Sequence, residues 1–223
     1  MSAPRRYRNI SDLPGVIPAF PLAGVILLPR TKLPLNIFEP RYLAMVDDAM
    51  DHFRLIGMIQ PRDPSADLTK NPPLADIGCV GRITEYSETD DGRYIIALTG
   101  IARFRVSGER ETRNAFRQLA ADYTLFAADL LSTQDPPIPR DRLLSALKPY
   151  LSDRAMKTDW TSIEEAPAET LVNALSMLCP FGPGEKQALL EAPGLKERVD
   201  ALITLLEIAN ASVMPSGGSP SIN

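Results

Sequence analysis

Residues 77–98 read IGCVGRITEYSETDDGRYIIAL and predict a β-hairpin. Apolar residues recur at every second position from Ile77 to Ile83, which is the period of a strand with two different faces. Asp90, Asp91 and Gly92 then supply the residues that tight turns prefer, and residues 94–98 return as the partner strand. This hairpin indicates that the N-terminal half of the chain is built from strands.

The residues that follow the hairpin have the pattern of a strand with one solvated side. Ala102, Phe104 and Val106 face one way, and Arg103 and Arg105 face the other. We therefore expect both arginines at the surface.

Three short apolar stretches precede the hairpin. Residues 16–22 and 33–38 are expected as edge or bulged strands, because a proline cannot donate a hydrogen bond to a neighbouring strand. Residues 55–59 read LIGMI and suit a strand buried on both faces. One more strand is expected within residues 116–126. The prolines that interrupt the first two stretches and the turn between them are Pro18, Pro21, Pro29 and Pro34.

A single helix is predicted among these strands. Pro40 suits the first position of a helix, where a missing N–H costs nothing. Apolar residues then recur with the helical period and predict one buried face. These residues are Tyr42, Met45, Val46, Ala49 and Met50.

The composition changes at residues 132–139, where three prolines form a stiff connector, and the remainder has helical periodicity. We predict a β-rich domain over 1–131, this connector, a helical bundle over 140–211 and a disordered tail over 212–223. One helix is expected to kink or end near Pro149, and Gly182-Pro183-Gly184 is expected as a turn between helices.

Composition and charge restrict the class of protein. The charge of −4 argues against a general nucleic-acid binder, and no apolar run is long enough to span a membrane. No apolar segment follows the early arginines, so we expect a cytoplasmic protein. Cys79 and Cys179 are 100 positions apart by their numbering, which matches no metal or redox motif, and both are expected as buried, reduced thiols.

The usual motifs of enzymes are missing from these 223 residues. His52 is the one histidine, expected as a surface group at the end of a helix, and it excludes sites that need two imidazoles. The sequence contains no Gly-Lys pair for a phosphate-binding loop and no G-x-S-x-G motif. We expect no catalytic residue, no metal and no cofactor.

An ordered set of motifs resembles the N-terminal domain of the Lon protease. It begins with Ile17-Pro18-Ala19-Phe20-Pro21-Leu22 and Leu33-Pro34-Leu35-Asn36-Ile37-Phe38-Glu39-Pro40-Arg41-Tyr42. It continues with Ile77-Gly78-Cys79-Val80-Gly81-Arg82-Ile83, Gly100-Ile101-Ala102-Arg103-Phe104 and residues 185–191. The resemblance covers residues 14–211.

The resemblance implies an α+β fold, in which barrel-like, twisted antiparallel β-sheets of PUA-like type carry one inserted helix and a helical bundle follows. It also implies a stand-alone module that engages unfolded or client polypeptides and lacks the ATPase and peptidase of Lon. The signature residues are expected to be mainly structural, with Phe38 and Tyr42 as apolar anchors of the helix and Glu39 and Arg41 as an ion pair. The full set is Phe38, Glu39, Pro40, Arg41, Tyr42, Gly78, Gly81, Gly100, Arg103 and Phe104.

Three binding functions remain open on the sequence alone, beside an enzyme of unrecognised type. The first is a polypeptide-binding module that adds a client segment to an exposed strand edge. The second is an adaptor or regulator that docks on a separate protease. The third and least favoured is RNA binding, through a sheet face that carries Arg82, Arg93, Arg103 and Arg105. The binding surface and the oligomeric state are left open.

Overall fold

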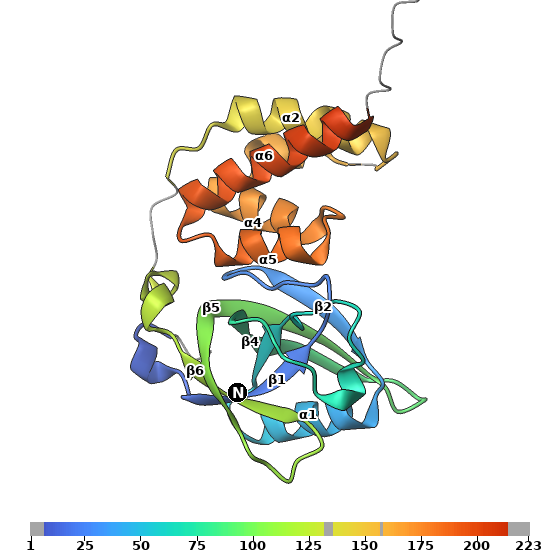
Figure 1. Cartoon of the computed structure of the whole chain (residues 1–223), viewed down its shortest axis with the longest axis vertical. Helices are drawn as coiled ribbons and strands as arrows, with labels where there is room; N and C mark the ends of the chain where they lie inside the picture. The colour runs from blue at the N-terminus through green and yellow to red at the C-terminus, as the bar shows by residue number, and fades with distance from the viewer. Residues whose placement is uncertain (1–6, 132–135, 157, 214–223) are drawn as a thin grey trace, which may run out of the picture. The chain divides into compact units, whose positions relative to one another are not determined.

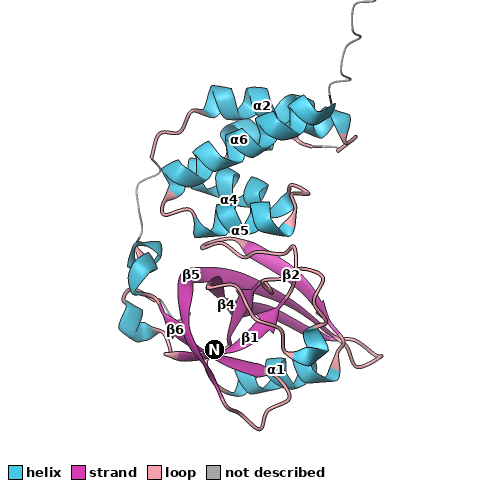
Figure 2. Cartoon of the chain, in the orientation of Figure 1, coloured by secondary structure: helices cyan, strands magenta, loops and turns pink. Residues whose placement is uncertain are grey.

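The computed structural model describes residues 7–131, 136–156 and 158–213 (Figure 1). The described residues pack into two compact units, one of residues 7–131 and 173–191 and the other of residues 136–172 and 192–213. The first unit holds the sheet, and the second is made of helices (Figure 2). Residues 173–191 were predicted to belong to the helical bundle, whereas their contacts join them to the sheet unit. The other predicted domain limits stay predictions.

Six strands form one mixed sheet in the order β2-β5-β4-β3-β1-β6. Their bounds are β1 Val16–Pro21, β2 Lys32–Ile37, β3 Leu55–Ile59, β4 Ile77–Glu88, β5 Tyr94–Arg110 and β6 Arg117–Asp122. The expectation of purely antiparallel sheets is wrong, because β1 and β3 pair in parallel. Parallel neighbours need a long crossover connection, and β2 together with α1 (Pro40–Asp51) provides it. The fold is therefore α+β with a mixed sheet.

The prolines do not confine β1 to an edge of the sheet, as the sequence had suggested. β1 pairs with β6 through Val16–Ala19 and with β3 through Ala19–Pro21. Because the two halves of the strand serve different neighbours, Pro18 affects only the first pairing and Pro21 only the second. β2, by contrast, is the terminal strand of the sheet order, as expected.

The hairpin predicted for residues 77–98 is confirmed as β4 and β5. Its turn runs from Thr89 to Arg93, with Gly92 at a φ of +77°. β5 is longer than the pattern indicated, because one continuous strand includes both the returning arm of the hairpin and residues 102–106. The C-terminal half of β5 also pairs with β6, across a register shift between Val106 and Gly108.

The prediction that Arg103 faces solvent is wrong. Its side chain is 4% exposed and forms a two-pronged ion pair with Asp129, whose side chain is 9% exposed. Arg103 Nε donates to Asp129 Oδ2 at 2.9 Å, and Nη2 donates to Oδ1 at 2.8 Å. The Arg103 backbone N–H also donates to Oδ2 at 3.0 Å, so the carboxylate is satisfied by both side chain and main chain.

The same arginine connects three parts of the first unit. Asp129 lies in the 3-10 segment η3 (Thr124–Leu130), and the guanidinium stacks over the ring of Phe126 at 4.1 Å. Its Nη1 donates to the carbonyl oxygen of Leu190 at 3.1 Å, in α5 (Pro183–Glu191). The buried guanidinium of Arg103, on β5, therefore bonds to groups of both η3 and α5.

A second buried polar group, Gln60, attaches α5 to the sheet. Its side-chain oxygen accepts a hydrogen bond from the Gly24 N–H at 2.7 Å. Its Nε2 donates to the Pro183 carbonyl and to Gln187 Oε1, each at 3.0 Å. Gln187 in turn donates to the Ile77 carbonyl at 3.1 Å. Asn173 adds a bond to the Pro29 carbonyl at 3.2 Å from α4 (Ala168–Leu178).

The signature glycines lie where main chains approach closely. A Cβ on Gly78 would lie 2.6 Å from the Met58 carbonyl oxygen and 2.6 Å from the ring of Phe104. A Cβ on Gly100 would lie 2.0 Å from the Leu28 carbonyl oxygen. Phe104 itself is fully buried in the core of the sheet. These positions exclude any side chain for steric reasons.

The remaining helices are α2 (Arg140–Asp153), α3 (Trp160–Glu165) and α6 (Leu195–Val213), all in the second unit. α2 continues through Pro149 rather than ending there. Gly182-Pro183-Gly184 is not only a turn, because Pro183 is the first residue of α5. The predicted tail beyond Val213 lies outside the described residues. The short 3-10 segments η1 (Ile10–Asp12) and η2 (Leu68–Lys70) complete the first unit.

Replacing Arg103 by Met is expected to reduce the free energy of unfolding by about 3–5 kcal/mol, because Asp129 then remains buried as an unpaired charge. Urea unfolding followed by circular dichroism measures this loss. The double variant Arg103→Met, Asp129→Leu should recover much of it. Arg93→Ala serves as control, because its pair with Asp91 is exposed and should contribute less than about 1 kcal/mol.

Gly100→Ala and Gly108→Ala provide a matched pair within β5. The first places a methyl group against the Leu28 carbonyl, and overpacking of this kind costs roughly 1–3 kcal/mol. The second meets no atom within 4 Å and should change the free energy of unfolding by less than about 1 kcal/mol. Equal thermal midpoints for the two variants would contradict the steric role of Gly100.

Candidate functional site

The first signature residues surround the N-terminal end of α1. Arg41 and Glu39 form the expected ion pair, with Arg41 Nη2 2.7 Å and Nε 2.9 Å from Glu39 Oε2. Arg41 Nη1 also donates to the Leu68 carbonyl at 2.8 Å and so anchors the loop between β3 and β4. Tyr42 is buried against the ring of Phe20, at 4.5 Å between centroids, and this burial raises the pKa of its phenol.

Phe38 is not the apolar anchor that the sequence suggested. Its side chain is 62% exposed, and it follows directly on the end of β2. Burial of the helix depends instead on Tyr42, Met45, Val46 and Ala49, four of the five residues in the predicted apolar face. An aromatic ring left in water at the end of an edge strand is a candidate contact for a partner.

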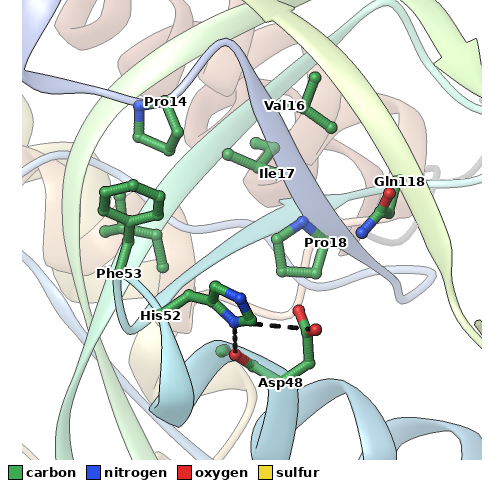
Figure 3. A pocket seen from close by; sticks show the side chains of 10 residues that line it. Pro14, Val16, Ile17, Pro18, Asp48, His52, Phe53 and Gln118 are labelled. Atoms are coloured by element: carbon green, nitrogen blue, oxygen red, sulfur yellow. Dashed lines mark hydrogen bonds and ion pairs between the residues drawn. The ribbon is translucent and has the colours of Figure 1, made fainter.

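A pocket of about 250 Å³ lies at the other end of α1 (Figure 3). The strand β1 and the residues before it form one wall, the end of α1 forms another, and β3 and β6 each add one residue. The pocket is centred where the first half of β1 has β6 as its neighbour and has not yet met β3. The lining residues are Pro14, Val16, Ile17, Pro18, Asp48, Ala49, His52, Phe53, Leu55 and Gln118.

Seven of the ten lining residues are apolar, and the polar ones are Asp48, His52 and Gln118. His52 ends α1, as predicted, with its Nδ1 2.7 Å from the carbonyl oxygen of Asp48 and 3.8 Å from the Asp48 carboxylate. Phe53 is 45% exposed at the rim, and its carbonyl accepts a hydrogen bond from Arg82 Nη1 at 3.2 Å. Apolar walls with a few polar groups are typical of a site for an organic side chain.

The free edge of β2 is a second candidate surface. Gly100 N–H donates to the Thr31 carbonyl, so alternate residues of β5 direct their backbone groups toward β2. By the register, the backbone groups of Lys32, Pro34 and Asn36 then point to the open side. Pro34 has no N–H, and this edge therefore offers fewer donors than a regular strand. Ile95 of β5 lies directly opposite Asn36, on the same face of the sheet as Asn36, and is 51% exposed.

A larger hollow of about 400 Å³ lies between the loop after β3 and α5, and it is less suited to a ligand. Its charged and polar groups already bind one another. Arg62 Nη2 lies 2.6 Å from Asp76, and Gln187 donates to Glu191 at 2.7 Å. A ligand would have to break these contacts before it gained its own.

The structure gives no support to a catalytic centre in its described part. Among the described residues, no three His, Cys, Asp or Glu side chains lie close enough to hold a metal ion. Both cysteines are buried and neither forms a disulfide, as predicted. Lys186 is buried, which lowers its pKa, but its Nζ donates to the Met177 carbonyl at 2.9 Å near the end of α4 and so has a structural partner.

A search of the described helices for one long and apolar enough to cross a membrane found none.

The four arginines considered for RNA binding do not form one exposed set. Arg103 is buried with Asp129, and Arg93 is paired with Asp91 at 2.9 Å. Arg82 donates to the hydroxyl of Tyr7 at 3.1 Å as well as to Phe53, whereas Arg105 is exposed. The sequence had no signal that distinguished Arg82 and Arg103 from exposed arginines, because their partners come from distant segments.

The signature residues were predicted from the sequence, whereas the residues that line the pocket were not. None of the ten signature residues lines it, and six of them are buried or packed against the core: Tyr42, Gly78, Gly81, Gly100, Arg103 and Phe104. Phe53 could have been noticed, since it continues the spacing of the predicted apolar face beyond the end of α1 at Asp51. Val16, Pro18 and Gln118 carry no such signal, because only the pairing of β1 with β6 brings them together.

Comparison with known proteins places this fold in a family. A model of the substrate-binding domain of the ATP-dependent protease La (LON) matches residues 16–207. Lon protease 2 of Myxococcus xanthus is 30% identical over 92% of this chain and 25% of its own length. The Lon protease of Dictyoglomus thermophilum is 26% identical over 92% of this chain and 27% of its own length. The chain thus spans about a quarter of the length of these curated relatives.

Solved structures agree on the fold. A Lon N-terminal domain protein from Xanthomonas campestris superposes with a TM-score of 0.61, at 23% identity over 85% of this chain and 97% of that one. The N-terminal domain of the Mycobacterium avium complex Lon protease gives the same TM-score at 14% identity, over 86% and 98% of the two chains. With the family model matching most of its length, this chain belongs to the Lon substrate-binding domain family.

Proposed function

We propose that this chain is a non-catalytic module that binds extended, apolar segments of unfolded polypeptides. The family is described as a substrate-binding domain, which supports polypeptide as the ligand class. The match covers the substrate-binding region of the relatives and about a quarter of their length. The 223 residues contain no phosphate-binding loop motif, so binding rather than hydrolysis is the proposed activity.

The pocket beside β1 is the observation that carries this proposal. Its volume of about 250 Å³ and its apolar walls suit one large side chain of a client. Burying such a side chain contributes roughly 1.5–3 kcal/mol. Single contacts of this size give weak binding that releases easily, which suits a module that must accept many sequences.

The free edge of β2 supplies a second contact in this proposal. An extended client can add to a strand edge through its main chain, with little dependence on sequence. Phe38 and Ile95 lie at this edge and offer apolar surface to alternate client side chains. We also propose that the sheet is barrel-like, because β6 pairs with both β1 and β5.

The adaptor function remains the alternative within this proposal. An adaptor would bring down one defined protease from cells, whereas a general client binder would bring down many unfolded proteins. RNA binding is not proposed further, because Arg103 is buried and Arg82 and Arg93 already bind protein groups, so the four arginines do not form one exposed set.

The proposal predicts that Phe53→Ala weakens binding of a permanently unfolded, reduced and carboxymethylated model protein by about tenfold, or 1.4 kcal/mol. Phe53 forms part of the pocket wall and is already 45% exposed, so the variant should keep its fold. Isothermal titration calorimetry measures the affinity, and thermal unfolding verifies the fold.

Two other exposed residues serve as matched controls for Phe53. Leu125→Ala removes a side chain that is 56% exposed on η3, outside both candidate surfaces, and should leave the affinity unchanged. Phe38→Ala reports on the β2 edge alone. Equal affinities for all three variants and the unmodified chain would assign binding elsewhere, and no binding by the unmodified chain would end the proposal.

A further inference from the structure

The hydrogen bond of His52 determines which nitrogen of its ring carries the proton. The Asp48 carbonyl oxygen can only accept, so Nδ1, at 2.7 Å from it, must donate. In the neutral ring the other nitrogen, Nε2, is then an acceptor. Nε2 has no partner among the described residues, and Figure 3 shows it on the side of the ring that faces Pro18, within the pocket.

The rest of the pocket surrounds this acceptor with apolar surface. Phe53, Val16 and Ile17 offer carbon atoms, and the second polar group near the opening is the Gln118 amide (Figure 3). A cavity of roughly 150 Å³ accommodates benzene, so the 250 Å³ here is large enough for a bigger aromatic ring. An occupant with a large ring and one donor atom would satisfy both the apolar walls and Nε2.

We propose that this pocket selects an aromatic client side chain that carries its own hydrogen-bond donor, above all tryptophan, and that neutral His52 accepts the indole N–H. This inference rests on the proposed polypeptide binding and names the side chain that the pocket prefers. A ring without a donor, as in phenylalanine, still fills the apolar space but leaves Nε2 without a partner. Loss of one such hydrogen bond lowers affinity roughly two- to tenfold.

Protonation of His52 removes the preference. The charged ring presents an N–H at Nε2, which faces the indole N–H donor to donor. Asp48 and His52 are the only titratable residues in the lining, and Asp51 lies nearby on the same helix. β1, β3 and β6 contribute no titratable side chain to the lining. The preference for tryptophan over phenylalanine therefore requires the neutral ring.

The test uses the full chain and fluorescein-labelled peptides that differ only at one central position. This position carries tryptophan, 1-methyltryptophan, which keeps the ring and lacks the N–H, or phenylalanine. Fluorescence anisotropy at pH 8 gives each affinity. We expect the tryptophan peptide to bind roughly two- to tenfold more tightly than the methylated one.

Two substitutions assign the effect to His52. His52→Asn keeps a donor near the Nδ1 position for the Asp48 carbonyl and removes the acceptor at the Nε2 position, so the preference should vanish. His52→Gln reaches farther and can place its amide oxygen near the Nε2 position, so part of the preference should return. A preference for tryptophan over 1-methyltryptophan that remains unchanged in His52→Asn would overturn the inference.

The possible results separate this inference from the proposed function. Equal binding of all three peptides at pH 8 would overturn the selection of a donor and leave polypeptide binding standing. No binding of any peptide would overturn both. If sedimentation shows a dimer that Phe53→Ala dissociates, the pocket holds a second copy of this chain, and the inference is wrong.

Discussion

The buried pair of Arg103 and Asp129 is the constraint on which the sheet unit depends. Two charges taken out of water are tolerated only when nearly every donor and acceptor is satisfied. Here that requirement specifies the positions of β5, η3 and the Leu190 carbonyl of α5 at the same time. A purely apolar contact would permit sliding, whereas a two-pronged arginine permits one arrangement. Gln60 likewise determines the position of α5 through hydrogen bonds, but between neutral groups.

Local patterns in the sequence were sufficient for most elements of the fold. The hairpin, the doubly buried β3 and the apolar face of α1 each depend on the spacing of neighbouring residues, and all were predicted. The failures have a common physical origin. Alternation correctly placed Arg103 on the other face from Phe104 but could not show that η3 and α5 cover that face. The prolines of β1 suggested an edge, because the sequence does not show that a strand can share its two halves between neighbours.

The candidate site follows from the same limit. Pro18, His52 and Gln118 come from β1, the end of α1 and β6, and the meeting of Pro18 with Gln118 depends on the β1–β6 pair that the sequence did not indicate. The motif residues, by contrast, are adjacent in sequence and mostly maintain the fold. A family signature and a binding surface are thus different sets of residues here, since the first preserves the scaffold and the second only needs to be apolar, open and suitably shaped.

The attachment of residues 173–191 to the sheet has a consequence for how the chain folds. Contacts between segments more than a hundred residues apart, such as Gln60 with Pro183, are slow to form because the intervening chain must close a long loop. During synthesis the strands leave the ribosome before α5 does, so Gln60 and Arg103 lack their α5 partners until α5 has been made. A shortened chain ending after η3 would leave Gln60 without two of its acceptors and Arg103 without the Leu190 carbonyl. Such a fragment should be aggregation-prone, although its own strands are complete.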